Sequence, residues 1–134
     1  MQAALKIRQV VFVEEQQVDP EIEYDEYEDV ATHVIAFVGE IAVGTARWRL
    51  AQESYKLERF AVLESYRGQG VGAALVKFVM KQLGQDRSIY LNSQMVALPF
   101  YEKLGFEAIG EVFYEANIPH RKMVYEHPQK SPQG

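Results

Sequence analysis

Three glycines within five residues are the feature that most constrains how this chain folds. They occur in the run Arg67-Gly68-Gln69-Gly70-Val71-Gly72, which follows a β-type segment and opens an amphipathic helical segment. Successive backbone N–H groups in such a loop point outward, and glycine lets an anion approach the main chain. The dipole of the following helix favours negative charge, and Arg67 adds a cation. The pattern predicts an anion site at a strand-to-helix junction.

The segments on the two sides of the loop differ in character. Before it, a helix is followed by closely spaced β-type runs, and Gly39-Glu40 is typical of a tight hairpin turn. After it, helical and β-type runs alternate. The predicted helices are 3–16, 72–83 and 97–104, and the predicted strands are 33–38, 41–50, 55–63, 88–92, 106–114 and 121–126. This order predicts a mixed α/β sheet.

Length and composition are those of one globular domain. We expect residues 1–134 to form a single domain, with a polar tail at 127–134. No apolar run approaches the roughly 20 residues that span a bilayer, so a cytoplasmic protein without a membrane partner is expected. The chain has no cysteine, which excludes disulfides and a thiolate nucleophile, and its three histidines lack the spacing of a metal site.

An acidic segment covers residues 14–29, which contain nine Asp or Glu and no Lys or Arg. A protein that binds nucleic acid presents a basic face, so no nucleic-acid partner is expected. Two interpretations of the segment remain open at this point. It is a solvated acidic loop, or it forms a negative rim that attracts a cationic or amine-bearing substrate.

Other kinds of loop share part of the glycine pattern. A Walker loop is excluded because no Gly-Lys-Ser/Thr follows. Gly68, Gly70 and Ala73 satisfy a dinucleotide fingerprint, which also needs a second parallel strand ending in an acid; the next strand ends Leu91-Asn92-Ser93. A tight structural turn is the remaining alternative. The arginine, the loop and the helix occur together, which favours anion binding over that alternative.

Two motifs resemble the GNAT N-acetyltransferase superfamily. Arg67-Gly68-Gln69-Gly70-Val71-Gly72 matches its Arg/Gln-x-x-Gly-x-Gly/Ala motif. The run 97–106, Ala-Leu-Pro-Phe-Tyr-Glu-Lys-Leu-Gly-Phe, resembles its second hallmark, a helix that carries Phe-Tyr-x-x-x-Gly-Phe. Segments 8–16, 44–49, 57–62 and 118–120 resemble the YjcF/ElaA-like branch, so the resemblance covers nearly the whole chain.

The resemblance implies a GNAT-like acyl-CoA N-acyltransferase fold. It also implies direct transfer of an acetyl group from acetyl-CoA to a primary amine of a small molecule in a ternary complex. Members usually begin with a β-strand ahead of the first helix, whereas this sequence begins almost in the helix, so we expect the first edge strand to be absent or shortened. A homodimer is common in the family. A non-catalytic acyl-CoA-binding module is the alternative function.

The resemblance further implies which residues hold acetyl-CoA. Main-chain groups of the strand before the loop would hold the thioester and its oxyanion, the loop would hold the pyrophosphate, and Gln94 stands where many members place an Asn that contacts the cofactor. The cofactor-binding residues implied in this way are Phe60, Ala61, Val62, Leu63, Arg67, Gly68, Gln69, Gly70, Val71, Gly72, Gln94, Pro99 and Tyr101.

Acid–base chemistry needs two further groups. Tyr101 matches the family's general acid, which protonates the leaving thiolate, and phenols suit that task. A base must take a proton from the amine, and Glu58 and His120 are preferred over Glu23 and Asp25. Glu58 lies on the strand that would carry the thioester, and histidine titrates near neutral pH. The sequence leaves the choice between these two open.

Overall fold

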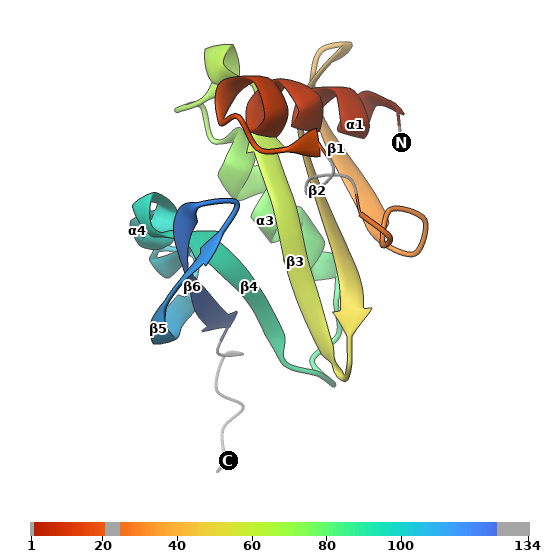
Figure 1. The fold of residues 1–134 in the computed structure, drawn as a ribbon. Coiled ribbons are helices and arrows are strands. Elements are labelled where there is room, and N and C mark those ends of the chain that lie inside the picture. The colour runs from red at the N-terminus through yellow and green to blue at the C-terminus, as the bar shows by residue number, and fades with distance from the viewer. Residues whose placement is uncertain (1, 21–24, 126–134) are drawn as a thin grey trace.

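The computed structural model describes residues 2–20 and 25–125, and a six-stranded mixed sheet forms its centre (Figure 1). The strand order is β1-β2-β3-β4-β6-β5. The strands are β1 (Thr32–Val38), β2 (Ile41–Ala51), β3 (Ser54–Val62), β4 (Ile89–Gln94), β5 (Phe106–Glu115) and β6 (Ile118–Tyr125). The helices are α1 (Gln2–Arg8), η1 (Gln9–Glu15), η2 (Glu64–Tyr66), α3 (Val71–Gln82), η3 (Met95–Ala97) and α4 (Leu98–Glu102). The predicted mixed α/β class is confirmed.

Strand pairing follows the predicted meander and then changes direction. β1, β2 and β3 pair antiparallel, β3 and β4 pair parallel, and β6 pairs antiparallel with both β4 and β5. The predicted hairpin at Gly39-Glu40 is confirmed, because Val38 pairs with Ile41 and Gly39 has φ +60°. Such a turn needs a left-handed residue, which glycine adopts without a steric penalty. In the described part of the chain before residue 32 no strand is present, and β1 forms an edge of the sheet.

Helices cover both faces of the sheet, with α1 in front and α3 behind in Figure 1. Leu75, Val76 and Val79 of α3 are buried against the main core, which includes Leu57 of β3 and Leu91 of β4. A second cluster joins the N-terminal helix to the other face of β3. Full burial of each such aliphatic side chain contributes about 1.5–3 kcal/mol. Within the described ranges, no helix is long and apolar enough to cross a membrane.

Most element boundaries differ from the predictions by a residue or two, and the short helix expected over 97–104 is α4 over Leu98–Glu102. Three further differences concern the N-terminal helix, β4 and β6. The helix expected over 3–16 changes at Gln9 into the π-helix η1, which has wider turns. β4 covers 89–94 rather than 88–92. β6 begins at Ile118, not at 121, because Ala116 and Asn117 take positive φ and form the turn themselves. Gly105 follows the short helix with a φ of +103°, a conformation that favours glycine.

Candidate active site

β3 and β4 separate in the middle of the sheet. Their parallel pairing covers only 55–57 with 89–91, and beyond it the two strands diverge (Figure 1). A cavity of about 870 Å³ lies in this opening, a size typical of small-molecule sites. From Glu58 onward, this edge of β3 has no strand partner in the described parts of the chain. Its backbone groups are therefore available to a ligand.

A β-bulge redirects β3 at this point. The pairing of β2 with β3 shifts, so Arg59 and Phe60 together lie opposite Ala46. Arg59 has φ +59°, a left-handed conformation that is uncommon for a residue with a side chain. Bulges redirect side chains and end regular pairing. Phe60 of the bulge and Ala61 after it line the cavity, which is where the resemblance places the thioester.

The glycine loop closes one end of the cavity. Gly68 and Gly70 have φ of +79° and +86°, and Gly70 is the residue that precedes the first turn of α3. At Gly72 an added Cβ would lie 3.3 Å from the Phe100 ring, so a larger residue would crowd the contact between the loop and α4. The loop thus has the left-handed glycines and the helix N-terminus that suit an anion.

The side chain of Arg67 is held on both sides. Its Nε donates to the Val62 carbonyl at 2.8 Å, and its two terminal nitrogens donate to the Glu15 carboxylate at 2.6 and 2.7 Å. Glu15 is the last residue of η1, so this ion pair joins the N-terminal helix to the glycine loop. Arg67 also lines the cavity.

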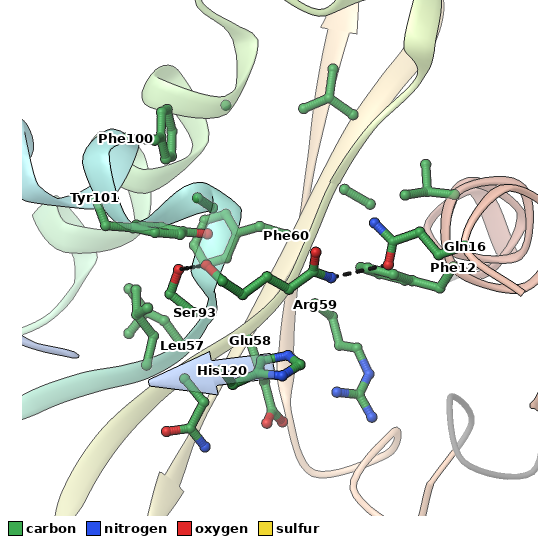
Figure 2. A pocket seen from close by; sticks show the side chains of 18 of the residues that line it. Phe12, Gln16, Leu57, Glu58, Arg59, Phe60, Ser93, Phe100, Tyr101 and His120 are labelled. Atoms are coloured by element: carbon green, nitrogen blue, oxygen red, sulfur yellow. Dashed lines mark hydrogen bonds between the residues drawn. The ribbon is translucent and has the colours of Figure 1, made fainter. Parts of the chain in front are cut away.

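Tyr101 enters the cavity from α4 (Figure 2). Its ring makes edge contacts with Phe60, Phe100 and Phe106, at centroid distances of 6.1, 4.9 and 6.0 Å. Burial raises the pKa of the Tyr101 phenol above its ordinary value. The group therefore stays protonated at neutral pH, which is the form that a proton donor needs.

His120 lines the cavity from β6 and lies opposite Gln94 in the ladder with β4. Its Nδ1 lies 2.7 Å from the Ile118 carbonyl oxygen, which only accepts hydrogen bonds. In the neutral ring this contact places the proton on Nδ1 and leaves the lone pair of Nε2 free to accept one. Nε2 also lies 3.8 Å from Glu115 Oε1, so a carboxylate lies beside this nitrogen.

Glu58 also lines the cavity, but three cations surround it. Its carboxylate lies 2.6 Å from Arg47, 2.8 Å from Arg49 and 3.3 Å from Lys56. Burial acts to raise the pKa of Glu58, yet the Arg49 hydrogen bond and the nearby positive charges outweigh it, and the pKa lies below its ordinary value. A carboxylate with a lowered pKa is a weaker base.

Gln94 contacts the N-terminal segment across the opening. Its Nε2 donates to Gln16 Oε1 at 3.0 Å, and Gln16 is labelled in Figure 2 with a dashed bond at its side chain. Gln16 directly follows η1 and lines the same cavity, as does Phe12. The N-terminal helix therefore forms a wall of the site. The signal for this wall in the sequence was the branch-like segment 8–16.

Most of the predicted site residues come together around this one cavity. The predicted residues that line it are Glu58, Phe60, Ala61, Val62, Arg67, Gly68, Gly70, Val71, Gly72, Gln94, Tyr101 and His120. Leu63, Gln69 and Pro99 are not among the lining residues. The backbone N–H of Leu63 donates to Val43, and the Gln69 side chain is turned to the Ser65 carbonyl. Glu23 lies outside the described residues.

Sequence reasoning missed several polar lining residues, chiefly Tyr27, Arg49 and Lys56. Arg47 and Arg59, on adjacent strands, both contact Asp25, at 2.7 and 3.2 Å. Over 2–20 and 25–125, no group of three or more His, Asp or Glu is arranged to hold a metal ion.

Comparisons with known proteins agree with this geometry. Residues 6–127 match the family model described as Acetyltransferase (GNAT) domain. YjcF of Bacillus subtilis (strain 168), named as an uncharacterized N-acetyltransferase, is 41% identical over 124 residues, which is 90% of this chain and 89% of YjcF. Protein ElaA of Escherichia coli (strain K12) is 29% identical over 131 residues, which is 92% of this chain and 86% of ElaA.

Solved structures show the same fold. An acyl-CoA N-acyltransferase from Pseudomonas aeruginosa superposes with a TM-score of 0.82 at 27% identity, over 92% of this chain and 88% of that one. An aminoglycoside 6′-N-acetyltransferase in complex with coenzyme A superposes with a TM-score of 0.72 at 19% identity, over 96% and 92% of the two chains. The second likeness is one of fold alone.

Proposed function

The chain belongs to the GNAT acetyltransferase family, and from its cavity we propose that it transfers an acetyl group from acetyl-CoA to a primary amine of a small-molecule acceptor, by direct attack in a ternary complex. The amine nitrogen forms a bond to the acetyl carbon, and the carbon–sulfur bond of the thioester breaks. One proton leaves the amine, and the CoA sulfur gains one. Acetyl-CoA supplies the activated acyl group; this chain supplies its binding and the proton transfers.

One observation carries the proposal: the separation of β3 from β4. It leaves a cavity that runs from the glycine loop, past the free edge of β3, to Tyr101 and His120. The loop end suits a pyrophosphate, because backbone N–H groups and the α3 N-terminus bind anions. A main-chain N–H at Phe60 or Ala61 would donate to the thioester oxygen, a contact worth about 3 kcal/mol in comparable acyl-transfer sites.

The surroundings of each side chain indicate which residue donates a proton and which accepts one. Tyr101 remains protonated because it is buried, and it donates to the leaving sulfur. His120 accepts the amine proton on Nε2, because Nδ1 is committed to the Ile118 carbonyl. Glu58 was an equal candidate in the sequence. We now prefer His120 because the cations around Glu58 stabilise its ionised form and weaken it as a base.

The test combines binding with turnover. We expect acetyl-CoA and CoA, but not NADH, to raise the melting temperature of the protein, since a ligand at one hundred times its Kd adds about 2.7 kcal/mol. Release of free CoA thiol should then depend on an added amine. No stabilisation by either CoA species would contradict the proposal. Binding without amine-dependent thiol release, over a broad set of amines, would leave only an acyl-CoA-binding module.

A further inference from the structure

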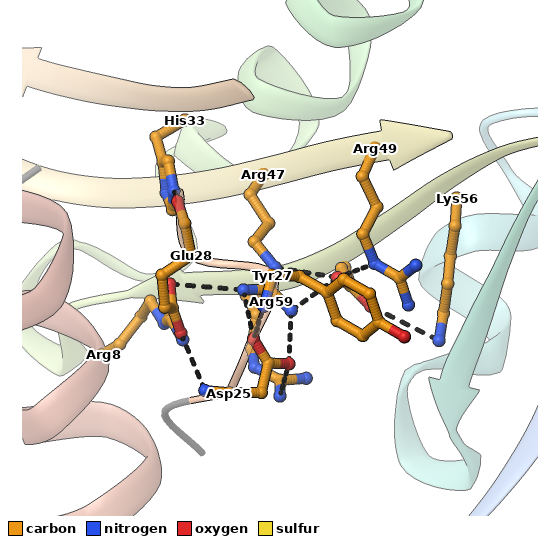
Figure 3. Close-up of polar contacts among 10 residues, drawn as sticks. Arg8, Asp25, Tyr27, Glu28, His33, Arg47, Arg49, Lys56 and Arg59 are labelled. Carbon is orange, nitrogen blue, oxygen red and sulfur yellow. Dashed lines mark hydrogen bonds and ion pairs between the residues drawn. The ribbon is translucent and has the colours of Figure 1, made fainter. Parts of the chain in front are cut away.

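Next to Glu58 the cavity wall carries more positive than negative charge; Arg49 and Lys56 of this wall are labelled in Figure 3. Arg47, Arg49 and Lys56 all contact the Glu58 carboxylate. The register of β2 with β3 brings them together, because Arg47 pairs with Glu58 and Arg49 pairs with Lys56. One carboxylate therefore faces three cations on the same face of the sheet.

Arg47 has its own partners. It donates two hydrogen bonds to Asp25, at 3.0 and 2.7 Å, and lies 3.2 Å from Glu28. Its side chain is only 1% exposed, so it belongs to a buried network rather than to the cavity surface. Arg49 and Lys56 differ, because each has Glu58 as its sole carboxylate partner among residues 2–20 and 25–125. Both line the cavity.

The guanidinium of Arg49 is positioned by two contacts. Its carbon lies 3.7 Å from the centroid of the Tyr27 ring, and its Nε donates to Glu58 at 2.8 Å. Arginine has five N–H donors, and Nε makes the one hydrogen bond that Arg49 forms with the described residues. A guanidinium that is fixed on an aromatic ring suits two-point binding of a carboxylate or phosphate.

The acidic segment does not oppose this charge at the cavity. Asp25 is the acid of that segment that lines the cavity among the described residues, and it is engaged by Arg47 and Arg59. The pKa of Asp25 is lowered to about 2: burial acts to raise it, but the hydrogen bonds from Arg47 and the Tyr27 backbone, with the charges of Arg47 and Arg59, together outweigh burial. Glu28 is held by Arg8 at 2.7 Å. Asp25 and Glu28 are thus neutralised by arginines, and Glu115, which also lines the cavity, lies beside His120 instead.

We propose that the acceptor amine carries an anionic group, a carboxylate or a phosphate, which binds Arg49 and Lys56 while the amine reaches the thioester beside Phe60. The inference rests on the proposed acetyl transfer and names its substrate class. Lys56 lies four residues from Phe60 on β3, about 13 Å of extended strand, although the long side chains of Arg49 and Lys56 shorten the gap. The acceptor therefore needs several bonds between its amine and its anion.

The reaction itself is unchanged. The acceptor nitrogen bonds to the acetyl carbon, the thioester carbon–sulfur bond breaks, His120 takes the amine proton and Tyr101 protonates the sulfur. The anion takes no part in these steps. It fixes the acceptor by one end, which lowers the KM for the acceptor and holds the amine in the orientation for attack.

The experiment compares acceptors of one chain length that differ only at the far end. Four linear primary amines are used, ending in a carboxylate, a phosphate, a neutral amide and a second amine. We expect kcat/KM to be at least about tenfold higher for the carboxylate or phosphate than for the amide, as charged hydrogen bonds allow. The ratio of kcat/KM for the carboxylate to kcat/KM for the phosphate shows which of the two anions is preferred. Glycine should be a poor acceptor, because its amine and carboxylate are too close together.

Two variants locate the effect. Arg49→Gln and Lys56→Gln should each raise the KM for the anionic acceptor about tenfold. The KM for acetyl-CoA and the rate with the amide should stay near wild type. Lys81→Gln, on the last turn of α3 and outside the cavity lining, is the matched control and should change neither. Because the two variants alter different strands, a folding defect in one leaves the other as the test.

Three outcomes overturn the inference. The first is that the diamine or the amide is acetylated as efficiently as the anionic amines. The second is that both variants slow the reaction of all acceptors equally, and the third is that glycine is the best acceptor. In each of these cases acetyl transfer itself stands and only the substrate class is wrong. If no amine of any charge is acetylated although acetyl-CoA binds, the proposed function fails, and the inference fails with it.

Discussion

Arg67 donates two hydrogen bonds to Glu15, and this ion pair connects the glycine loop to the end of η1. Both side chains are partly exposed, at 39% and 37%. Ion pairs at such exposure contribute at most about 1 kcal/mol, so another anion can displace the carboxylate at little cost. We infer that the CoA pyrophosphate takes over Arg67 from Glu15 when it binds the loop.

The first prediction separates the two roles of this pair. Arg67→Ala should raise the KM for acetyl-CoA about tenfold, because a charged contact to phosphate is lost. Glu15→Gln keeps the arginine and removes its competitor, so the affinity for acetyl-CoA should be equal to or higher than wild type. If Glu15→Gln weakens binding as much as Arg67→Ala, the pair holds the loop in place and Arg67 does not bind the pyrophosphate.

The second prediction concerns loop conformation. Gly70→Ala forces a side chain into φ +86°, which costs about 1–2 kcal/mol, and it should also raise the KM for acetyl-CoA. Gly39→Ala is the matched control, because its φ of +60° imposes a similar strain in a hairpin away from the cavity. Both variants should melt at a lower temperature, whereas only Gly70→Ala should bind acetyl-CoA poorly. Equal KM values would show that the loop geometry does not matter for binding.

The third prediction tests the proton donor. Tyr101→Phe keeps the aromatic contacts and removes the hydroxyl, so kcat should fall by about 10²–10⁴ while acetyl-CoA still binds. Because burial raises the pKa of Tyr101, the wild-type rate should show no loss from tyrosine ionisation up to about pH 10. Tyr55→Phe removes a hydroxyl that bonds Asp86 outside the cavity and should keep full activity. Full activity in Tyr101→Phe would exclude the phenol as the donor.

The fourth prediction tests the base through pH dependence. With a base beside the bound amine, kcat/KM for the amine should reach a plateau well below the pH at which the amine itself deprotonates. In His120→Gln the rate should be lower and should rise continuously toward about pH 10, where the amine itself deprotonates. His33→Gln, a change outside the cavity lining, should retain the plateau. A plateau that persists in His120→Gln and disappears in Glu58→Gln would assign the base to Glu58.

The fifth prediction follows from the lowered pKa of Asp25. A carboxyl whose folded-state pKa is about 2, against an ordinary value near 4, stabilises the fold above about pH 4 and loses that contribution as the pH falls toward 2. Asp25→Asn should therefore melt at a lower temperature than wild type at pH 7. The difference should shrink between pH 4 and pH 2. A difference that does not change with pH would mean that the Asp25–Arg47 contact does not depend on charge.

Local signals were sufficient for much of the fold. The hairpin turn at Gly39-Glu40 was predicted, and Gly39 takes the left-handed conformation that it needs, because such a turn depends on a single residue and its neighbours. The start of β6 at Ile118 was not predicted. Proline is unfavourable in strands, so the presence of Pro119 in the sequence argues against a strand at this position. The pairing of Pro119 with Tyr114 in β5 and the pairing of His120 with Gln94 in β4 decide the boundary, and these are contacts between distant segments.

Site residues that belong to short sequence motifs were predicted, whereas those that reach the cavity through the register of paired strands were missed. The glycine loop and Tyr101 belong to short motifs with a recognisable pattern. Arg49 and Lys56 have no such pattern. They face the cavity because of the β2–β3 register, and a shift of one residue would turn them to the other face. The π-helix η1 was also not predicted, because apolar residues at a helical spacing of 3.6 do not distinguish a π-helix from an α-helix.

The most direct test of acetyl transfer in this cavity follows a labelled acetyl group. Wild-type protein, Gly39→Ala, Gly70→Ala and Tyr101→Phe are incubated with isotope-labelled acetyl-CoA and the series of linear amines, and the amines are analysed by mass spectrometry. The account predicts labelled N-acetyl product with wild type and Gly39→Ala. Gly70→Ala should form less of this product at low acetyl-CoA concentration, and Tyr101→Phe should form almost none. Labelled product at equal rates in all four proteins, or in none, would contradict it.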